Sequence, residues 1–458
     1  MNVSIKGRKT LGALVALTTL SGLAGFAPAA HAAQPYTVGC GPARHLDLAL
    51  AIQAADTNGI PDTINLAKNC TYTYSTAFGD EAALPDITED LTINGNGSTI
   101  KRHSSAPDMR LLNNDADDLV LRSLTFTGGR FDASSAGGTV VVAGGIQNTG
   151  GLRATSVKVT NNSITATDLG VAAVALAAGI GSTGPIELRN STVSGNKAAV
   201  GCTVTCTIGL VAAGGIGATD ELTLDGTKVT GNSAKAFGGL VQLTLAGGVG
   251  HLSTERMSDE DGTISSNAAQ GFGGLVNLAI GGGVAFANAG TQSFGDDEAD
   301  DFSAALEDTT VSSNTVSSDS SVIAVALGGG LAQLSGDVFG EEIEVKSNKA
   351  TTNAAGGSAL GAGYAQVAGF GHFEDSDFTK NTASAPSGVA QGGGWFIAGD
   401  VEADGGSISK NTAKGGVAQG GGLFALDGAE VDLFDVTMSG NKPQNCFYGN
   451  SATVSGCS

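Results

Sequence analysis

Aromatic and basic side chains are both scarce in this chain. It holds one Trp and five Tyr in 458 residues, and 23 Lys and Arg against 44 Asp and Glu, which leaves a formal net charge of −21. A sugar-binding groove lined by aromatic rings is therefore disfavoured. An acidic surface repels polyanions, and neither a phosphate-cradling loop nor a dinucleotide fingerprint is present. We therefore expect no nucleic-acid partner.

Long apolar runs are also missing, except near the N-terminus. Three basic residues precede an apolar run from Leu11 to about Phe26, and Ala30-His31-Ala32 fits a small-x-small cleavage site. This order is typical of a secretory signal peptide, residues 1–32, and the mature chain would start at Ala33. The alternative, an uncleaved membrane anchor, is disfavoured because the run is short and interrupted by polar residues. We expect a secreted, extracellular protein with no membrane span after cleavage.

Cysteine is limited to six residues, whose positions favour local pairing. Six cysteines allow about 15 connectivities, and an exported chain meets an oxidising compartment. We predict three disulfides, Cys40 with Cys70, Cys202 with Cys206, and Cys446 with Cys457. The first and last would staple the two ends of the fold. Free buried thiols are the alternative, and a zinc site is disfavoured because no Cys-x-x-Cys or nearby histidine pair occurs.

Helical periodicity is nearly absent, whereas glycine is abundant, with 71 residues. Segments such as Leu91–Asn94 alternate apolar and polar residues in the manner of strands. One exception, Leu46–Ala55, predicts a short helix with Leu46, Ala49 and Leu50 on one face. The chain is therefore expected to be all-β, with one helix that covers the open first coil.

An asparagine recurs three residues after an apolar side chain at nine places. These pairs are Val159 and Asn162, Val193 and Asn196, Val229 and Asn232, Ile264 and Asn267, Val311 and Asn314, Val345 and Asn348, Phe378 and Asn381, Ile408 and Asn411, and Met438 and Asn441. The steps from Asn to Asn are 30 to 36 residues, except for one of 47. A period in this range belongs to stacked repeats, so the chain is predicted to be a solenoid.

A second marker, a small or glycine pair followed by an apolar residue, alternates with the first. Its members are Gly144-Gly145-Ile146, Ala178-Gly179-Ile180, Gly214-Gly215-Ile216, Gly247-Gly248-Val249, Gly282-Gly283-Val284, Gly329-Gly330-Leu331, Ala362-Gly363-Tyr364, Gly393-Gly394-Trp395 and Gly421-Gly422-Leu423. The apolar residue precedes the next Asn by 16 to 18 residues in eight cases and by 30 in one. One coil therefore carries a large insertion, which includes five acids between Asp296 and Asp301.

The two markers together predict a parallel β-helix with three short strands per coil. The apolar residue before each Asn would point inward, and the Asn would occupy a turn, tolerate unusual dihedral angles and bond to the Asn of the next coil. We expect about twelve coils, nine of them marked. The predicted organisation is a signal peptide (1–32), an N-terminal cap with a short helix (33–62) and one β-helix domain (63–458).

The paired markers, as in Gly421-Gly422-Leu423 with Ser439-Gly440-Asn441, resemble the repeats of the polymorphic outer membrane proteins. The whole mature chain resembles secreted right-handed β-helix proteins with a pectate-lyase-like fold, and Leu84–Ile100 looks like the entry coil of that group. The resemblance implies a right-handed solenoid. No alternating barrel strands follow the last coil, so the resemblance does not imply display by a C-terminal membrane barrel.

Because many β-helices act on polysaccharides, we compared the chain with the chemistry of those enzymes. Pectin hydrolases of this fold carry paired aspartates, Gly-His-Gly and Arg-x-Lys, and this chain offers only Gly371-His372-Phe373. His372 and His251 each lie near carboxylates, but no spacing indicates a nucleophile or an oxyanion donor. A noncatalytic function is favoured, and a polysaccharide lyase or glycoside hydrolase remains the alternative.

Acidic residues fall in register with the repeated Asn. Six residues before it stand Asp261, Asp308, Glu342, Asp375 and Asp435, and seven before it stand Asp225, Glu260, Glu307, Glu341, Glu374 and Asp404. Equal register in a solenoid means vertical stacking about 5 Å apart, which raises some carboxyl pKa values. Calcium accepts loose carboxylate sets, so the first five residues are a candidate calcium site. The alternative is a solvated acidic corner that keeps the rod soluble.

The best candidate partner-binding patch consists of Trp395, Phe396 and Phe424, which lie on neighbouring coils. Packing in the core or at an end is the alternative for these rings. Together the observations favour an exported, noncatalytic β-helix that binds an extracellular glycan or protein. Calcium is the only cofactor that the sequence suggests.

Overall fold

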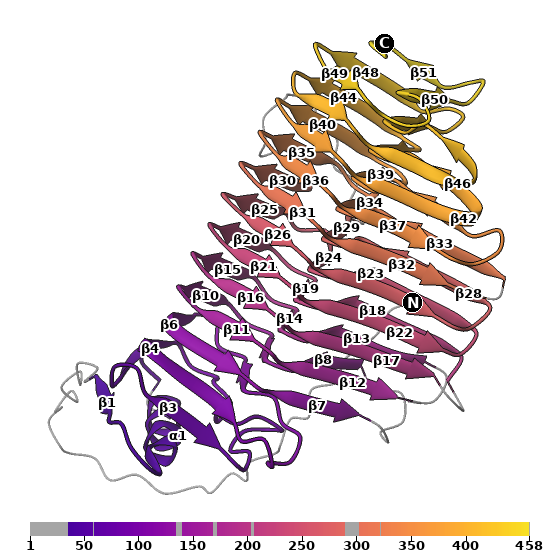
Figure 1. Ribbon diagram of the computed structural model, residues 1–458. Coiled ribbons are helices and arrows are strands. Elements are labelled where there is room, and N and C mark those ends of the chain that lie inside the picture. Colours follow the sequence, from indigo (N-terminus) through magenta and orange to yellow (C-terminus); the bar gives the residue numbers. More distant parts are fainter. Residues whose placement is uncertain are drawn as a thin grey trace, which may run out of the picture.

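The chain folds into a parallel β-solenoid of about nine turns with one short N-terminal helix (Figure 1). The computed structural model describes residues 35–57, 59–133, 140–167, 172–202, 206–288, 302–320 and 322–457. The predicted signal peptide and the five acids of the large insertion lie outside these residues. Nine turns correspond to the nine coils marked by Asn, and the count of twelve was too high.

Sheet 1, the longest of three, contributes two strands to each turn. Its first column contains β10 (Leu152–Thr155), β15 (Ile186–Arg189), β20 (Leu222–Asp225), β25 (Met257–Glu260), β30 (Ala304–Glu307), β35 (Val338–Glu341), β40 (Phe370–Glu374), β44 (Asp400–Asp404), β48 (Glu430–Phe434) and β51 (Thr453–Val454). Its second column contains β11 (Lys158–Thr160), β16 (Thr192–Ser194), β21 (Lys228–Thr230), β26 (Thr263–Ser265), β31 (Thr310–Ser312), β36 (Glu344–Lys346), β41 (Asp377–Thr379), β45 (Ser407–Ser409) and β49 (Thr437–Ser439). The N-terminal strands of this sheet are β1 (Tyr36–Val38), β2 (Asp62–Leu66), β3 (Thr71–Tyr74), β4 (Leu91–Arg102) and β6 (Leu119–Thr127).

Sheet 2 follows with an outgoing and a returning strand in each turn. The outgoing strands are β7 (Arg130–Ala133), β12 (Ser163–Thr167), β17 (Lys197–Cys202), β22 (Ser233–Gly238), β27 (Ala268–Phe272), β32 (Thr315–Asp319) and β37 (Lys349–Thr352). The returning strands are β8 (Val140–Ala143), β13 (Ala172–Ala177), β18 (Ile208–Ala213), β23 (Val241–Ala246), β28 (Val276–Ile280), β33 (Ile323–Leu327) and β38 (Ser358–Leu360). Two longer strands, β42 (Thr382–Gln391) and β46 (Thr412–Gln419), continue both columns.

Sheet 3 closes each of the nine turns with one short strand, from β9 to β47, and has one further strand at each end, β5 and β50. Its members are β5 (Leu112–Asn114), β9 (Ile146–Asn148), β14 (Ile180–Ser182), β19 (Ile216–Ala218), β24 (Val249–Ser253), β29 (Val284–Asn288), β34 (Leu331–Ser335), β39 (Tyr364–Gln366), β43 (Trp395–Ile397), β47 (Leu423–Ala425) and β50 (Cys446–Tyr448). A full turn therefore holds five strands, and the prediction of three was wrong because it did not foresee that sheets 1 and 2 each contribute two strands.

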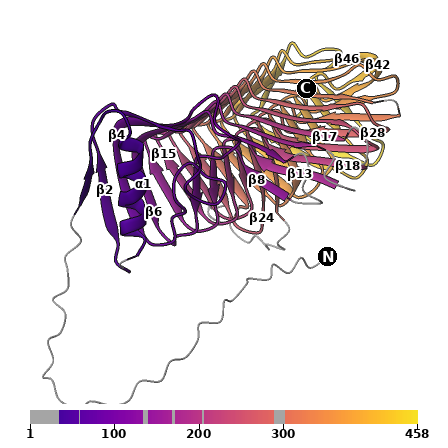
Figure 2. The same ribbon diagram turned by 90° about the horizontal axis from the view of Figure 1, so that it is seen from below.

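The two columns of sheet 2 pack against each other and project from the main core, and we call this two-layer extension the wing (Figure 2). Alanine is the commonest residue of its interior, with members such as Ala269 and Ala350 from outgoing strands and Ala279 and Ala359 from returning strands. Buried polar side chains, Gln242 and Asn277 among them, also lie there. Because alanine is small, the two layers approach closely and still exclude water. The main core, in contrast, is filled by Leu, Ile, Val and aromatic side chains between sheets 1 and 3.

The repeated asparagines form one continuous ladder at the base of the wing. All nine are buried, none more than 8 % exposed. In a representative turn, Asn267 Nδ2 donates to Asn314 Oδ1 (3.1 Å) and to the main-chain oxygen of Val229 (2.8 Å), and Asn267 Oδ1 accepts from the main-chain nitrogen (2.9 Å) and Nδ2 (3.0 Å) of Asn232. The predicted stacking of amides is confirmed. The left-handed conformation belongs to the residue before each Asn, for example Ser266 with φ 57°.

The second glycine of each Gly-Gly marker lies against this ladder. A Cβ on Gly248 would stand 2.6 Å from the main-chain oxygen of Gly283 and 2.9 Å from Asn267 Nδ2. The equivalent glycines of the other turns, such as Gly215 and Gly330, meet the same two partners in their own turns. The two sequence markers are therefore one structural unit, in which glycine lets the backbone approach the buried amide.

We predict that Gly248→Ala lowers the free energy of unfolding by about 2–3 kcal/mol, because backbone atoms of two turns must separate. Gly271→Ala is the matched control, since its added Cβ would meet nothing closer than 3.6 Å. Chemical denaturation of both variants checks the prediction. Equal stabilities would contradict the close approach as the reason for the marker.

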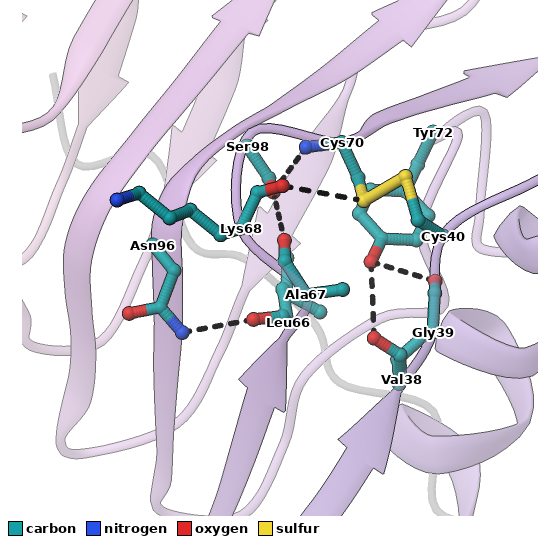
Figure 3. The surroundings of a disulfide bond; sticks show 10 residues. All are labelled: Val38, Gly39, Cys40, Leu66, Ala67, Lys68, Cys70, Tyr72, Asn96 and Ser98. Carbon is teal, nitrogen blue, oxygen red and sulfur yellow. Dashed lines mark hydrogen bonds between the residues drawn. A yellow bond between two sulfur atoms is a disulfide. The ribbon is translucent and has the colours of Figure 1, made fainter.

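The N-terminal end is covered by α1 (Arg44–Ala55), as predicted, although its buried face differs from the expected one. Leu48 and Ile52 are fully buried, whereas Leu46 and Leu50 are 42 % and 63 % exposed. All six cysteines lie in the three predicted pairs at disulfide distance. Figure 3 shows the first pair, where Cys70 N donates to Ser98 Oγ (2.9 Å) and Tyr72 Oη donates to the main-chain oxygen of Gly39 (3.0 Å). The first bond joins the residue before β3 to β4, and the second joins β3 to the residue after β1.

Candidate functional site

The acids seven residues before each Asn stack on the outer face of sheet 1. Strand pairing places Asp225 opposite Glu260, Glu260 opposite Glu307, and Glu307 opposite Glu341. The series continues through Glu374 and Asp404. Six consecutive turns therefore carry a carboxylate at one position, and the predicted vertical register is confirmed.

The predicted calcium residues occupy the turn that follows this strand. Asp261, Asp308, Glu342, Asp375 and Asp435 all have left-handed backbones, with φ between 44° and 54°. In other turns the same position holds Ser156, Asn190, Gly226 or Gly405, also with positive φ. Asp, Asn and Gly tolerate this conformation better than other residues. Backbone geometry therefore gives a reason for aspartate here that requires no bound ion.

Repulsion between neighbouring turns is strongest at Glu342. The adjacent carboxylate of Asp308 raises the pKa of Glu342, and Glu341 and Asp375 add to the effect. Within the part of the chain that the structure describes, His, Cys, Asp and Glu side chains form no group of three or more that could hold a metal ion. Calcium binding along this turn column stays a prediction.

Because like charges oppose each other here, Glu342→Gln is expected to raise the melting temperature slightly at neutral pH, by at most about 1 °C. The gain should disappear at high salt, which screens exposed charges. Lowering the pH should also remove the gain in melting temperature. Because its pKa is raised, Glu342 loses its negative charge at a higher pH than an ordinary glutamate does. A loss of stability at neutral pH would contradict the repulsion.

The predicted aromatic patch is divided between two sides of sheet 3. Trp395 is 1 % exposed and packs edge-on against Phe378 (4.9 Å between centroids) in the main core. Phe396 and Phe424 point outward, where they stack with each other (5.6 Å, 3°) and with Phe447 (5.7 Å, 7°). Neighbouring residues of a strand point to opposite faces, so Trp395 does not share the patch. Its inclusion was wrong, and Phe396 and Phe424 are themselves only 7 % and 5 % exposed.

The two histidines considered as candidate bases, His372 and His251, both contact neighbouring groups of the fold. His372 Nε2 lies 3.0 Å from Glu374 Oε1, and its ring stacks on Phe339 (5.7 Å, 6°). His251 is buried, contacts the main-chain oxygen of Asp220 (3.0 Å), and burial lowers its pKa.

Shallow hollows lie along the outer face of sheet 1. One of about 240 Å³ is lined by Asp118, Arg153 and Glu187, and another of about 270 Å³ by Arg189, Asp225 and Glu260. The arginines are already paired, Arg153 with Asp118 and Arg189 with Glu187. Their charges are therefore largely neutralised by the chain itself.

The largest feature that sequence reasoning missed is the outer face of the returning strands, which we call the apolar wing face. Strand pairing aligns its residues into ladders. The outermost ladder contains Ile208, Val241, Val276 and Ile323. The next contains Val174, Leu210, Leu243, Leu278 and Val325. Ile208, Val241 and Ile323 are 42 %, 37 % and 50 % exposed, so solvent reaches aliphatic side chains along the whole ladder.

The apolar wing face continues in two directions. Toward the wing tip, Leu240, Leu275 and Val322 are 49 %, 46 % and 59 % exposed. Toward the base, a third row that includes Leu245 and Leu327 packs with the outward residues of sheet 3. None of the strands β13, β18, β23, β28, β33 and β38 contains Asp, Glu, Lys or Arg.

The outer face of the outgoing strands, on the opposite side of the wing, carries polar and charged residues. The outgoing strands present Thr165, Lys197, Lys235, Ser317 and Asp319 at their outward positions. Lys235 also lies over the rings of Phe237 and Phe272, at 5.6 and 5.2 Å from their centroids. One layer of the same two-layer structure is thus polar outside, and the other is aliphatic.

Comparison of the chain with models of known protein families, with curated proteins and with solved structures finds no match. Among the described residues, no helix has both the length and the apolar character needed to cross a membrane.

Proposed function

We propose that this chain is an exported, noncatalytic right-handed β-helix, with repeats of the polymorphic outer membrane protein type, that acts by binding a protein partner. The apolar wing face is the observation that carries the proposal. Aliphatic side chains in contact with water cost about 25 cal/mol per Å² relative to burial, and a contiguous patch of them marks an interaction surface. The surface belongs to a regular sheet, which presents it without rearrangement.

A protein fits this face better than a glycan. Sugar hydroxyl groups require hydrogen-bond partners when they are buried, and the outermost ladder of Ile208, Val241, Val276 and Ile323 supplies none. Glycan sites also use aromatic stacking, whereas the described wing-face ladders are aliphatic. The stacked Phe396 and Phe424 at the far end of sheet 3 are mostly covered. Apolar side chains of a protein need no hydrogen-bond partners when they are buried, so they can pack on this face.

The alternative function, a polysaccharide lyase or glycoside hydrolase of the pectate-lyase-like superfold, draws support from the hollows on sheet 1. Carboxylates such as Asp118 and Glu187 line them beside arginines. Acid and base catalysis needs carboxylates whose environments differ. Here both are partly exposed and ion-paired, so their environments are alike, which supports the noncatalytic proposal instead.

The proposal is tested with the oxidised mature chain, incubated with neutral and acidic polysaccharides with and without calcium. We expect no new reducing ends and no unsaturated uronates. Turnover that Glu187→Gln abolishes would overturn the noncatalytic proposal in favour of the alternative. Identification of the amino-terminal residue in the same preparation tests secretion, and we expect this residue to be Ala33.

Calcium titration by calorimetry, with and without a chelator, tests the remaining cofactor hypothesis. Saturable heat that disappears in an Asp308→Asn, Asp375→Asn variant would assign calcium to the turn column. An unchanged melting temperature and no heat would reject it.

A further inference from the structure

We propose that the apolar wing face binds the same face of a second copy of this chain, so that the protein forms a two-fold symmetric dimer. This inference rests on the proposed function and identifies the partner. The interface would be the contact of two aliphatic sheets, as in a β-sandwich.

The chemistry of the face restricts its partner. The exposed ladder of Ile208, Val241 and Ile323 offers shape and apolar area but no charge and no hydrogen-bonding group. A matching partner must be flat, aliphatic and spaced at about 4.8 Å, the distance between strands of a sheet. The same ladder of a second copy has this spacing and chemistry. A two-fold axis through the middle of the face lets each ladder meet its counterpart.

Two acidic chains must avoid charge repulsion when they associate. The net charge of −21 is substantial, but the stacked carboxylates lie on the first column of sheet 1. Figures 1 and 2 both show that column at the opposite side of the molecule from the wing. At physiological salt, charges more than about 8 Å apart are largely screened. The acidic columns of two copies would therefore face away from the interface.

The size of the face is sufficient for a reversible dimer. Six returning strands at about 4.8 Å each, with about five residues per strand at 3.3 Å, give a projected area of roughly 500 Å² per copy. Two copies cover about 1,000 Å², which is the lower limit for a specific protein interface. We therefore expect association that depends on protein concentration.

The architecture of the wing does not itself require this apolar exterior. The outgoing strands have the same alanine-lined interior and the same strand pairing, yet carry Lys197, Lys235 and Asp319 outside. Polar residues are therefore compatible with the fold at outward positions. Polar residues are absent from the outward positions of β13, β18, β23, β28 and β33, and this absence is therefore specific to one side of the wing.

The test is sedimentation equilibrium of the oxidised mature chain from about 1 to 100 μM. Wild-type protein should reach twice the monomer mass as concentration rises. The variant Val241→Asp, Ile323→Asp would bury four carboxylates in the interface, and its dissociation constant should rise at least about hundredfold. Both positions are exposed, so the fold is retained, which a melting curve verifies. The control is Thr165→Asp, Ser317→Asp on the polar side, which should dimerise like the wild type.

Two results would overturn the dimer: a wild-type chain that stays monomeric at the highest concentration, or a dimer that persists in the Val241→Asp, Ile323→Asp variant. Monomeric protein that binds neutral phosphatidylcholine vesicles through the same face would replace the second copy by a lipid surface. Polysaccharide turnover, measured separately, would overturn the noncatalytic function and leave the sedimentation result intact. The two failures are therefore distinguishable.

Discussion

Asn267→Ala should lower the free energy of unfolding by on the order of 4 kcal/mol, because it removes the amide at the centre of the buried ladder. The change removes the acceptor of Asn232 N and the side-chain donor to the main-chain oxygen of Val229. It also removes one of the two acceptors of Asn232 Nδ2, which keeps its bond to the main-chain oxygen of Val193. Each buried group left unsatisfied costs about 1–3 kcal/mol. Chemical denaturation measures the loss.

Two further variants distinguish the loss of hydrogen bonds in the ladder from the loss of side-chain volume. Asn162 begins the ladder, and its Oδ1 accepts from Gly129 N, so Asn162→Ala should cost about half as much. Asn267→Asp keeps the shape but cannot donate to Asn314 Oδ1, and should cost more than alanine at neutral pH. Equal losses at Asn162 and Asn267 would contradict a ladder that depends on both neighbours.

The second large effect is expected from Asp259, an inward residue of β25. It is 2 % exposed, it aligns with Leu224 and Leu306 inside the core, and neither carboxyl oxygen has a hydrogen-bond partner among the described residues. Burial raises its pKa from 3.8 to about 8. At neutral pH the native chain therefore keeps a proton that the unfolded chain has lost.

The sign of the pH dependence follows from this difference. Between about pH 4 and 8 the native state binds more protons at Asp259, so its stability falls as pH rises, by up to about 1.4 kcal/mol per pH unit. Summed over the interval, the loss approaches about 5 kcal/mol at pH 8. Asp259→Asn, which cannot ionise, should remove this slope. It should therefore match the wild type near pH 4 and exceed its stability near pH 8.

Denaturation curves of both proteins from about pH 4 to 9 check the prediction. Asp432→Asn, on the outer face of β48, is the control for a carboxylate in solvent and should leave the wild-type slope unchanged. Parallel pH profiles for the wild type and Asp259→Asn would show that Asp259 does not titrate in this interval.

The repeat markers predicted the solenoid because each performs one physical task in every turn. Asn satisfies buried backbone groups, and the second glycine of each pair leaves room for the Asn amide, so both recur once in every turn. The stacked acids Glu307 and Glu341 were predictable for the same reason, since the period of the sequence is the register of the sheet. The cysteine pairs were predictable from their short separations in the sequence.

The wing could not be predicted, because its returning strands do not alternate apolar residues inside with polar residues outside. In β23, Gln242 and Thr244 point inward, whereas Val241 and Leu243 point outward. In Ala172–Ala177 the inward residues are alanines and the outward ones include Val174 and Leu176, so the alternation that reveals a half-buried strand is missing. The inward orientation of Trp395 was not predicted for a related reason. Adjacent large residues, Trp395 and Phe396, give no indication of which faces the core.

The side-chain amides of the asparagine ladder also give the solenoid a dipole along its axis. Every amide donates from Nδ2 toward the turn that follows, from Asn162 to Asn196 and onward to Asn441, so the side-chain dipoles add head to tail and polarise one another. The series is terminated at both ends, by the Gly129 amide as first donor and by Asn445 Oδ1 as last acceptor. A coil inserted anywhere between them must bring its own amide in the same orientation, because a single gap leaves a donor facing a turn that offers no acceptor.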